Sequence, residues 1–245
     1  MKILKVIARL LDYPTEELIQ HRQEITDFIL GDNTLDDSQR SALSDFVASF
    51  SAEYLLDKQA DYDGLFERGR SLSLLIFEHL HGESRDRGQA MVDLLSQYKT
   101  AGLDIGVREL PDYIPLYLEF ASTQGEMAVG WLQDIAPILA LLAVRLEQRD
   151  STYAVLMHSL LQLSEADIDL SALRQQVSEE KRDDTPKALD KVWEEEAVTF
   201  GGDAVNGGCP TSRQRPSETQ RRDQEFPLQF FDAAQPQTSG SELRN

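Results

Sequence analysis

Cysteine is almost absent from this sequence, since Cys209 is the only one in 245 residues. An intrachain disulfide is therefore impossible, which fits a reducing compartment. Long hydrophobic runs are also absent: the longest, Ile135 to Val144, is about half the length of a membrane-spanning helix, which needs about 20 residues. The first stretch, MKILKVIARLLDYP, is interrupted by Lys5 and Arg9 and lacks the apolar core of a secretory signal. We therefore expect a cytoplasmic protein without direct membrane insertion.

Positive charge is scarce as well. The chain has 24 Lys and Arg against 43 Asp and Glu, for a formal net charge of −19 at pH 7. Residues 1–200 hold 19 of these basic residues and 37 of the acidic ones, so the negative charge belongs to the main body of the chain. An acidic body repels nucleic acid and attracts basic segments. We therefore expect no nucleic-acid partner and consider a basic peptide a suitable one.

Helical periodicity dominates residues 1–200. Apolar residues recur at steps of three and four, and no stretch shows the alternation of a strand or an internal repeat. Thr15 follows a break at Tyr13–Pro14 and is placed to cap the next helix, whose first turn carries Glu16 and Glu17. These patterns predict an all-α helical bundle of about eight or more helices.

Proline and glycine mark where the helices should begin, bend or stop. Pro111 and Pro115 suit a helix only in or near its first turn, and Pro137 predicts a kink inside a longer helix. After about Phe200 the chain becomes rich in Gly, Pro, Ser and Gln and poor in core-forming residues. We expect an all-helical domain over residues 1–200 and a flexible C-terminal tail of low order over 201–245.

Catalytic and metal-binding signals are weak. His79 and His81 lie two residues apart, so on a helix they would point about 200° from each other. Cys209 lies in a glycine-rich stretch without features that would lower the pKa of its thiol. The glycine pairs at 201–202 and 207–208 lack the Lys-Ser/Thr of a phosphate loop. The sequence therefore predicts no catalytic residues and no metal site.

The spacing of side chains in residues 62–80 predicts two stripes along a helix. The first predicts a core face of one continuous helix: Leu65, Gly69, Leu72, Ile76 and Leu80. The second combines aromatic rings with an arginine: Phe66, Arg70, Ser73 and Phe77. Arg70 fits two roles, either a core-edge residue paired with an acid such as Glu67 or a fixed charge in a groove wall. The acidic run Glu194–Glu196 similarly fits either a solvated helix face or a docking point for a basic peptide.

Four stretches, in order, carry a family resemblance: YDGLFERGRSLSLLIFEHLHGESRDRGQAMVDLLSQY, RELPDYIPLYLEF, DIAPILALLAVRLEQR and RDDTPKALDKVWEEEAVTF. They resemble the nitrate reductase molybdenum cofactor assembly chaperones, the NarJ/NarW family, within the wider TorD/DmsD group of redox-enzyme maturation chaperones. The resemblance covers about residues 2–200. It implies a single-domain helical bundle of the TorD-like type.

The resemblance also implies a function. Such a chaperone binds the N-terminal segment of the apo catalytic α subunit of respiratory nitrate reductase. It keeps that subunit competent for insertion of the molybdenum bis-guanine-dinucleotide cofactor and an iron–sulfur cluster, and it prevents premature docking on the membrane anchor. The chaperone itself binds no cofactor stably, and the molybdenum cofactor delivery machinery is a further partner to test.

A peptide-binding site follows from the same resemblance, which associates the groove with the first two stretches. We assign it to eight residues within them: Phe66, Arg70, Phe77, Glu78, Asp112, Tyr113, Pro115 and Tyr117. Two other classes of function remain open, namely an adaptor that binds a folded partner and a small hydrolase that uses His79 or Cys209. Direct nucleotide or cofactor binding has no motif to support it.

Overall fold

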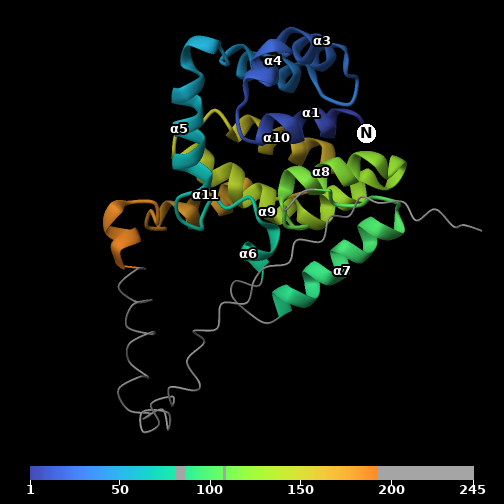
Figure 1. The fold of residues 1–245 in the computed structure, drawn as a ribbon. Coiled ribbons are helices and arrows are strands. Elements are labelled where there is room, and N and C mark those ends of the chain that lie inside the picture. Colours follow the sequence, from blue (N-terminus) through green and yellow to red (C-terminus); the bar gives the residue numbers. More distant parts are fainter. Residues whose placement is uncertain (81–85, 107–108, 192–245) are drawn as a thin grey trace, which may run out of the picture. The chain divides into compact units, whose positions relative to one another are not determined.

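The computed structural model describes residues 1–80, 86–106 and 109–191, shown in colour in Figure 1. Within these ranges the chain forms α-helices and two 3-10 turns, and no strand. The helices are α1 (Ile3–Leu11), α2 (Glu16–Gln20), α3 (Arg22–Gly31), α4 (Asp37–Ala48), α5 (Leu55–Phe66), α6 (Ile76–Leu80), α7 (Asp86–Thr100), α8 (Ile114–Thr123), α9 (Ala128–Gln148), α10 (Ala154–Ser164) and α11 (Leu170–Ser178). The predicted all-α class is confirmed.

Local capping explains where several helices begin. The Thr15 hydroxyl accepts a hydrogen bond from the Leu18 N–H, as its position in the sequence predicts. Asp36 accepts from Gln39 N at 2.7 Å, and Asp169 caps α11 in the same way. The helix that Thr15 caps is the short α2, and the chain turns at His21 before α3 begins.

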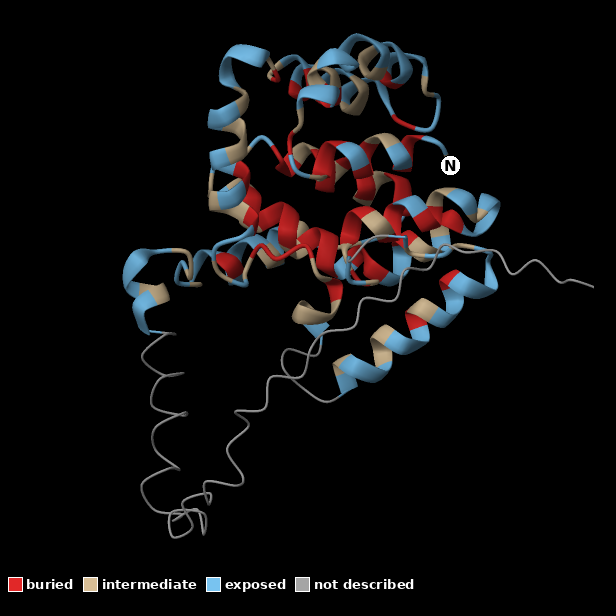
Figure 2. Cartoon of the chain, in the orientation of Figure 1, coloured by how far each residue is buried: buried red, intermediate tan, exposed pale blue. Residues whose placement is uncertain are grey.

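The core is built around α9. This helix packs most extensively against α10, while α1 packs against α8. Buried residues gather on these four helices, as the red segments in Figure 2 show. Gly125–Gln148 is long and apolar enough to cross a membrane, but 56% of its most apolar window is buried within the protein. Burial of this kind is typical of the core helix of a soluble protein, which accounts for the composition.

Helix α7 is held mainly by its C-terminal half. Leu94 and Tyr98 are its buried residues, whereas most of its surface is exposed (Figure 2). The Tyr98 hydroxyl donates to the Pro111 carbonyl oxygen at 2.8 Å, and its ring lies 4.5 Å from the Phe120 ring between centroids. These contacts connect α7 to α8 and to the segment before it.

The continuous helix predicted over residues 65–80 is wrong. Helix α5 ends at Phe66, and α6 begins only at Ile76. Gly69, which the spacing places in the helix interior, instead has φ +78°, a conformation that a glycine adopts readily and that a right-handed helix excludes. Leu80, predicted on the core face, is 58% exposed. Residues 67–75 form a connecting segment, here called the 67–75 loop.

Pro115 lies in the first turn of α8, as predicted, and Pro137 lies inside α9. The proposed boundary at Phe200 and the tail over 201–245 lie outside the described residues. The same holds for His81, Glu194–Glu196 and Cys209. The predicted division into residues 1–200 and 201–245 stays a prediction.

Candidate functional site

The 67–75 loop is joined to the segment before α8 by backbone hydrogen bonds. Ile114 N donates to the Leu74 carbonyl oxygen at 2.8 Å, and Ile76 N donates to the Asp112 carbonyl oxygen at 2.9 Å. Leu75 and Tyr113 form an isolated antiparallel bridge between these bonds. Two stretches that lie far apart in the sequence therefore form one surface, and they are the two to which the peptide site was assigned.

A pocket of about 240 Å³ opens on this surface. Its lining comes from the end of α5, the 67–75 loop and the segment before α8: Phe66, Glu67, Ser73, Leu74, Leu75, Glu109, Leu110 and Tyr113. We call this set the acidic groove. Phe66 is 5% exposed and packs 4.8 Å from the Tyr62 ring and 5.2 Å from the Tyr153 ring, so it forms a rigid apolar base. Leu110 is 42% exposed.

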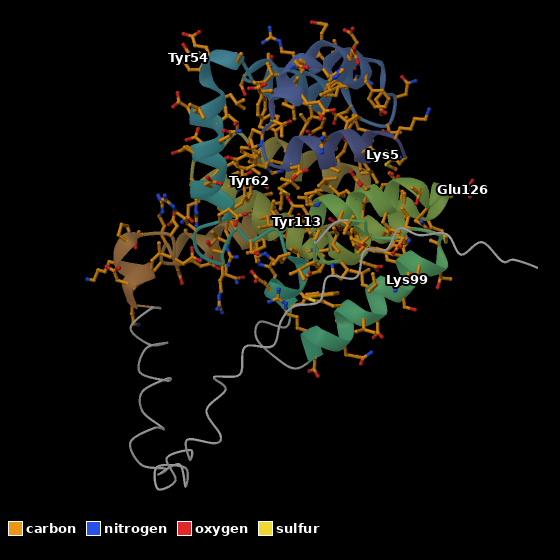
Figure 3. All side chains as sticks on the ribbon, in the orientation of Figure 1. Lys5, Tyr54, Tyr62, Lys99, Tyr113 and Glu126 are labelled. Carbon is orange, nitrogen blue, oxygen red and sulfur yellow. The ribbon has the colours of Figure 1, made fainter. Side chains whose placement is uncertain are left out.

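A hydrogen-bonded pair of tyrosines stabilises one wall of the acidic groove. The hydroxyls of Tyr62 and Tyr113 lie 3.2 Å apart, and the Tyr113 hydroxyl donates to Asp12 Oδ1 at 3.2 Å. The single Tyr62 hydroxyl proton is shared between the Tyr113 hydroxyl oxygen and the Leu11 carbonyl oxygen, each 3.2 Å away. Figure 3 labels both tyrosines, one on α5 and one at the start of α8. Burial raises the pKa of both hydroxyls, so they remain neutral hydrogen-bonding groups.

The described lining of the acidic groove carries two carboxylates, Glu67 and Glu109, and no cationic side chain. Apolar surface is supplied by Phe66, Leu75 and Leu110 beside them. This combination suits an amphipathic segment that places an apolar side chain in the pocket and basic side chains at its edge. It has no nucleophile paired with a base, which covalent catalysis would require.

Asp112 lies in the segment before α8, next to the N-terminal end of α6 and near Arg87 of α7. The residue is fully buried, and its Oδ2 accepts from Phe77 N at 3.1 Å, while Oδ1 has no protein partner. Burial raises the pKa of the Asp112 carboxyl, partly opposed by this hydrogen bond and by the charge of Arg87. Glu78 accepts from Arg87 at 3.3 Å. These residues connect α6, α7 and the segment before α8, and they do not line the groove.

The remaining predicted residues occupy different places. Tyr117 is buried, with its hydroxyl donating to the Trp131 carbonyl oxygen at 2.7 Å, so it belongs to the α8–α9 contact. Pro115 is buried in the first turn of α8. Arg70 lies in the 67–75 loop and does not share a helical stripe with Phe66 and Phe77, because no helix connects them. Of the eight assigned residues, Phe66 and Tyr113 line the acidic groove.

Sequence reasoning missed the two carboxylates and the leucines of the groove. Glu109 and Leu110 stand directly before Pro111, within a stretch that had already drawn attention. Glu67 follows the last helical residue of α5 and was considered only as a partner for Arg70. Recognising Gly69 as a helix-ending glycine would have indicated that Glu67 and Leu75 lie on a loop.

His79 has a structural role. Its Nε2 lies 2.8 Å from the Ser73 carbonyl oxygen, and burial lowers the pKa of the imidazole. A neutral ring that donates from Nε2 fits this arrangement. Among the described residues, no three His, Cys, Asp or Glu side chains are grouped to hold a metal ion.

The chain is similar to nitrate reductase molybdenum cofactor assembly chaperones. The family model described as the nitrate reductase delta subunit matches residues 32–158. The chain is 51% identical over 210 residues to the nitrate reductase molybdenum cofactor assembly chaperone NarJ of Escherichia coli K12, covering 85% of this chain and 88% of that protein. It is 48% identical over 201 residues to the protein of the same strain that carries the name NarW, covering 82% and 84%.

A solved structure shows a more distant likeness. A redox enzyme maturation protein from Archaeoglobus fulgidus is 16% identical to the chain. It aligns with a TM-score of 0.47 over 67% of this chain and 93% of that one.

Proposed function

The chain belongs to the nitrate reductase delta subunit family, and we propose that its acidic groove binds the N-terminal segment of the apo catalytic α subunit of respiratory nitrate reductase. Its general role is that of a chaperone in the assembly of the molybdenum cofactor of nitrate reductase, and it is not itself an enzyme. In the finer proposal, the bound α subunit stays competent for insertion of the molybdenum bis-guanine-dinucleotide cofactor and an iron–sulfur cluster. Binding of this segment prevents premature docking of the α subunit on the membrane anchor.

The composition of the acidic groove is the observation that carries this proposal. Its lining combines the apolar side chains of Phe66 and Leu75 with the carboxylates of Glu67 and Glu109, which matches what a helix-in-groove interaction needs. Apolar anchors give affinity, and the carboxylates favour a basic segment and fix its orientation. The net charge of −19 also draws a basic segment toward the protein before contact.

The size of the groove favours a peptide anchor over a cofactor. Its 240 Å³ is less than the roughly 300–1,000 Å³ of typical small-molecule sites. One or two side chains of a peptide fit such a volume, whereas a bis-dinucleotide cofactor is far larger. In this proposal the chaperone assists cofactor insertion by holding its client and does not bind the cofactor stably. The cytoplasm is the compartment we propose, and the cofactor delivery machinery is a further proposed partner.

Calorimetric titration with a synthetic peptide of the N-terminal segment of the cognate α subunit tests this function. Leu110→Ala removes an exposed anchor of the groove and is expected to weaken binding by about 1–3 kcal/mol. Leu56→Ala is the matched control, because Leu56 is 80% exposed and does not line the groove. Equal affinities for the wild type and L110A would remove the groove from the proposal.

An adaptor that recognises a folded partner is the competing function. It would bind the mature α subunit as well as the apo form, whereas the chaperone prefers the apo form. A pull-down with equal amounts of both forms separates the two functions, and equal recovery would favour the adaptor.

A further inference from the structure

The segment that follows α11 returns to the 67–75 loop through one carboxylate. Asp183 Oδ2 accepts from Arg70 N at 2.6 Å and from Ser71 N at 2.7 Å. Its Oδ1 accepts from the Ser71 hydroxyl at 2.6 Å. Two successive backbone N–H groups that converge on one oxygen form an anion-binding nest. The loop therefore has a specific ligand, supplied by a residue more than a hundred positions away.

Gly69 makes room for this ligand. Its φ of +78° turns the chain so that the next two N–H groups face Asp183. A Cβ at Gly69 would lie 2.7 Å from Asp183 Cγ and 2.8 Å from both carboxylate oxygens. Any other residue at 69 would therefore strain the backbone and also displace the carboxylate.

Two arginines reinforce the contact, Arg145 of α9 and Arg149 directly after its last residue. Arg149, whose side chain is 7% exposed, donates to the Ser71 hydroxyl at 2.7 Å and to Asp183 Oδ1 at 3.3 Å. Arg145 donates to the Ser71 carbonyl oxygen at 2.8 Å. Burial alone would raise the pKa of Asp183, but the hydrogen bonds from Ser71 and the loop backbone outweigh it and hold this pKa below its usual value. Asp183 is therefore ionised at neutral pH.

The loop that Asp183 holds is also a wall of the acidic groove. Glu67, Ser73, Leu74 and Leu75 all line the groove, and Asp183 does not. The nest at Arg70 and Ser71 lies between Glu67 and Ser73 in the chain. A loop released from Asp183 would lose the ligand of its Arg70 and Ser71 N–H groups and keep the contacts of Ser71 with Arg145 and Arg149 in this middle part. Its two ends remain joined to α5 and to the segment before α8.

We propose that Asp183 is a positioning residue for client binding: it fixes the 67–75 loop in the shape that presents Glu67 and Leu75 to the peptide. The inference rests on the proposed function of the acidic groove. It adds that affinity for the client depends on a carboxylate that the client does not touch. It also connects the groove to the segment after α11 and so gives that segment a part in recognition.

The test compares Asp183→Ala with Asp184→Ala in the full-length protein. Asp184 accepts from Arg149 at 3.1 Å and from Arg182 at 2.7 Å, and no hydrogen bond joins it to the described part of the loop. Both substitutions remove an ion pair of Arg149, but only the first releases the nest. Affinity for the α-subunit N-terminal peptide is measured by calorimetry well below the melting temperature, so that a change in stability alone leaves it unchanged. Asp183→Asn serves as a milder variant if Asp183→Ala folds poorly.

We expect Asp183→Ala to weaken peptide binding about tenfold or more and Asp184→Ala to change it less than about twofold. Gly69→Ala should reproduce the effect of Asp183→Ala. In a Glu67→Gln background the effect of Asp183→Ala should shrink, because Asp183 acts partly through Glu67. Hydrogen exchange at the Arg70 and Ser71 amides should accelerate in Asp183→Ala and stay slow in Asp184→Ala.

Three results would count against the inference in different ways. If the wild type binds the peptide and Asp183→Ala binds it equally well, Asp183 has no positioning role, while the proposed function stands. If the wild type does not bind the peptide at all, the proposed function fails and takes this inference with it. Equal losses in Asp183→Ala and Asp184→Ala would also count against it, because they would point to a general effect of the ion pairs.

Discussion

Replacing Arg149 with methionine is expected to lower the free energy of unfolding by about 2–4 kcal/mol at neutral pH. Methionine keeps much of the aliphatic volume but removes the donors to Asp183, Asp184 and the Ser71 hydroxyl. Removing one partner of a buried ion pair costs about 3–5 kcal/mol. We reduce this figure because the Asp183 side chain is 34% exposed and Asp184 keeps its contact with Arg182.

The destabilisation should depend on pH. The pKa of Asp184 is lowered mainly by the hydrogen bond from Arg182, with the charge of Arg149 adding to it, and the pKa of Asp183 is lowered as well. A carboxyl whose folded pKa is depressed contributes stability above its unfolded pKa of about 3.9 and loses that stability as the pH falls through the folded value. Without Arg149 the pKa of Asp184 is depressed less, so the variant loses less stability when the pH falls. The difference in free energy of unfolding between wild type and R149M should therefore become smaller below about pH 4.

Urea unfolding followed by far-UV circular dichroism across this pH range measures the gap. Arg182→Met is the matched control, because Arg182 is 60% exposed and should contribute less than about 1 kcal/mol. A loss below about 1 kcal/mol in R149M at neutral pH, or a gap that does not change with pH, would refute the assignment of Arg149 as the buried partner of both carboxylates.

Leu72→Ala should lower the free energy of unfolding by about 2–5 kcal/mol in denaturant titrations, because Leu72 is fully buried and its loss leaves a cavity; a loss below about 1 kcal/mol would contradict this. Tyr113→Phe removes the hydrogen bonds to Tyr62 and Asp12 and should cost about 0.5–1.5 kcal/mol in the same assay, while a more stable variant would argue against the tyrosine pair. Raising the salt concentration should slow association of a basic peptide more than it speeds dissociation in stopped-flow kinetics, and an association rate insensitive to salt would remove electrostatic steering. Truncation after Phe200 should leave the melting temperature nearly unchanged if the predicted boundary is right; a large drop would move the boundary.

Much of the fold could be predicted from local patterns. The apolar spacing of residues 3–11 and the cap at Thr15 depend only on neighbours in the chain, and both appear as expected. The region 65–80 could not be predicted in this way, because its apolar residues keep helical spacing although residues 67–75 are not helical. What decides its conformation is a positive φ at Gly69 and a ligand at Asp183, and the second is invisible to any local pattern.

The candidate site could likewise be predicted only in part. The two stretches that form the acidic groove were identified together through a family resemblance, and the structure joins them by backbone hydrogen bonds. The individual side chains were harder to choose, because aromatic residues such as Tyr117 have the same appearance in sequence whether they face a groove or the core. Burial of Tyr117 is decided by α9, which packs against α8 from a distant part of the chain.

Photocrosslinking from position 110 to the apo α subunit tests most directly whether the acidic groove receives the client. A photoreactive amino acid is tolerated there because Leu110 is 42% exposed, and the same group at position 56 controls for chance encounters. The account predicts a crosslink from position 110 that maps to the N-terminal segment of the α subunit, is absent from position 56 and is lost with the mature enzyme. Crosslinks of equal yield from both positions, or a crosslink that maps outside the N-terminal segment, would contradict it.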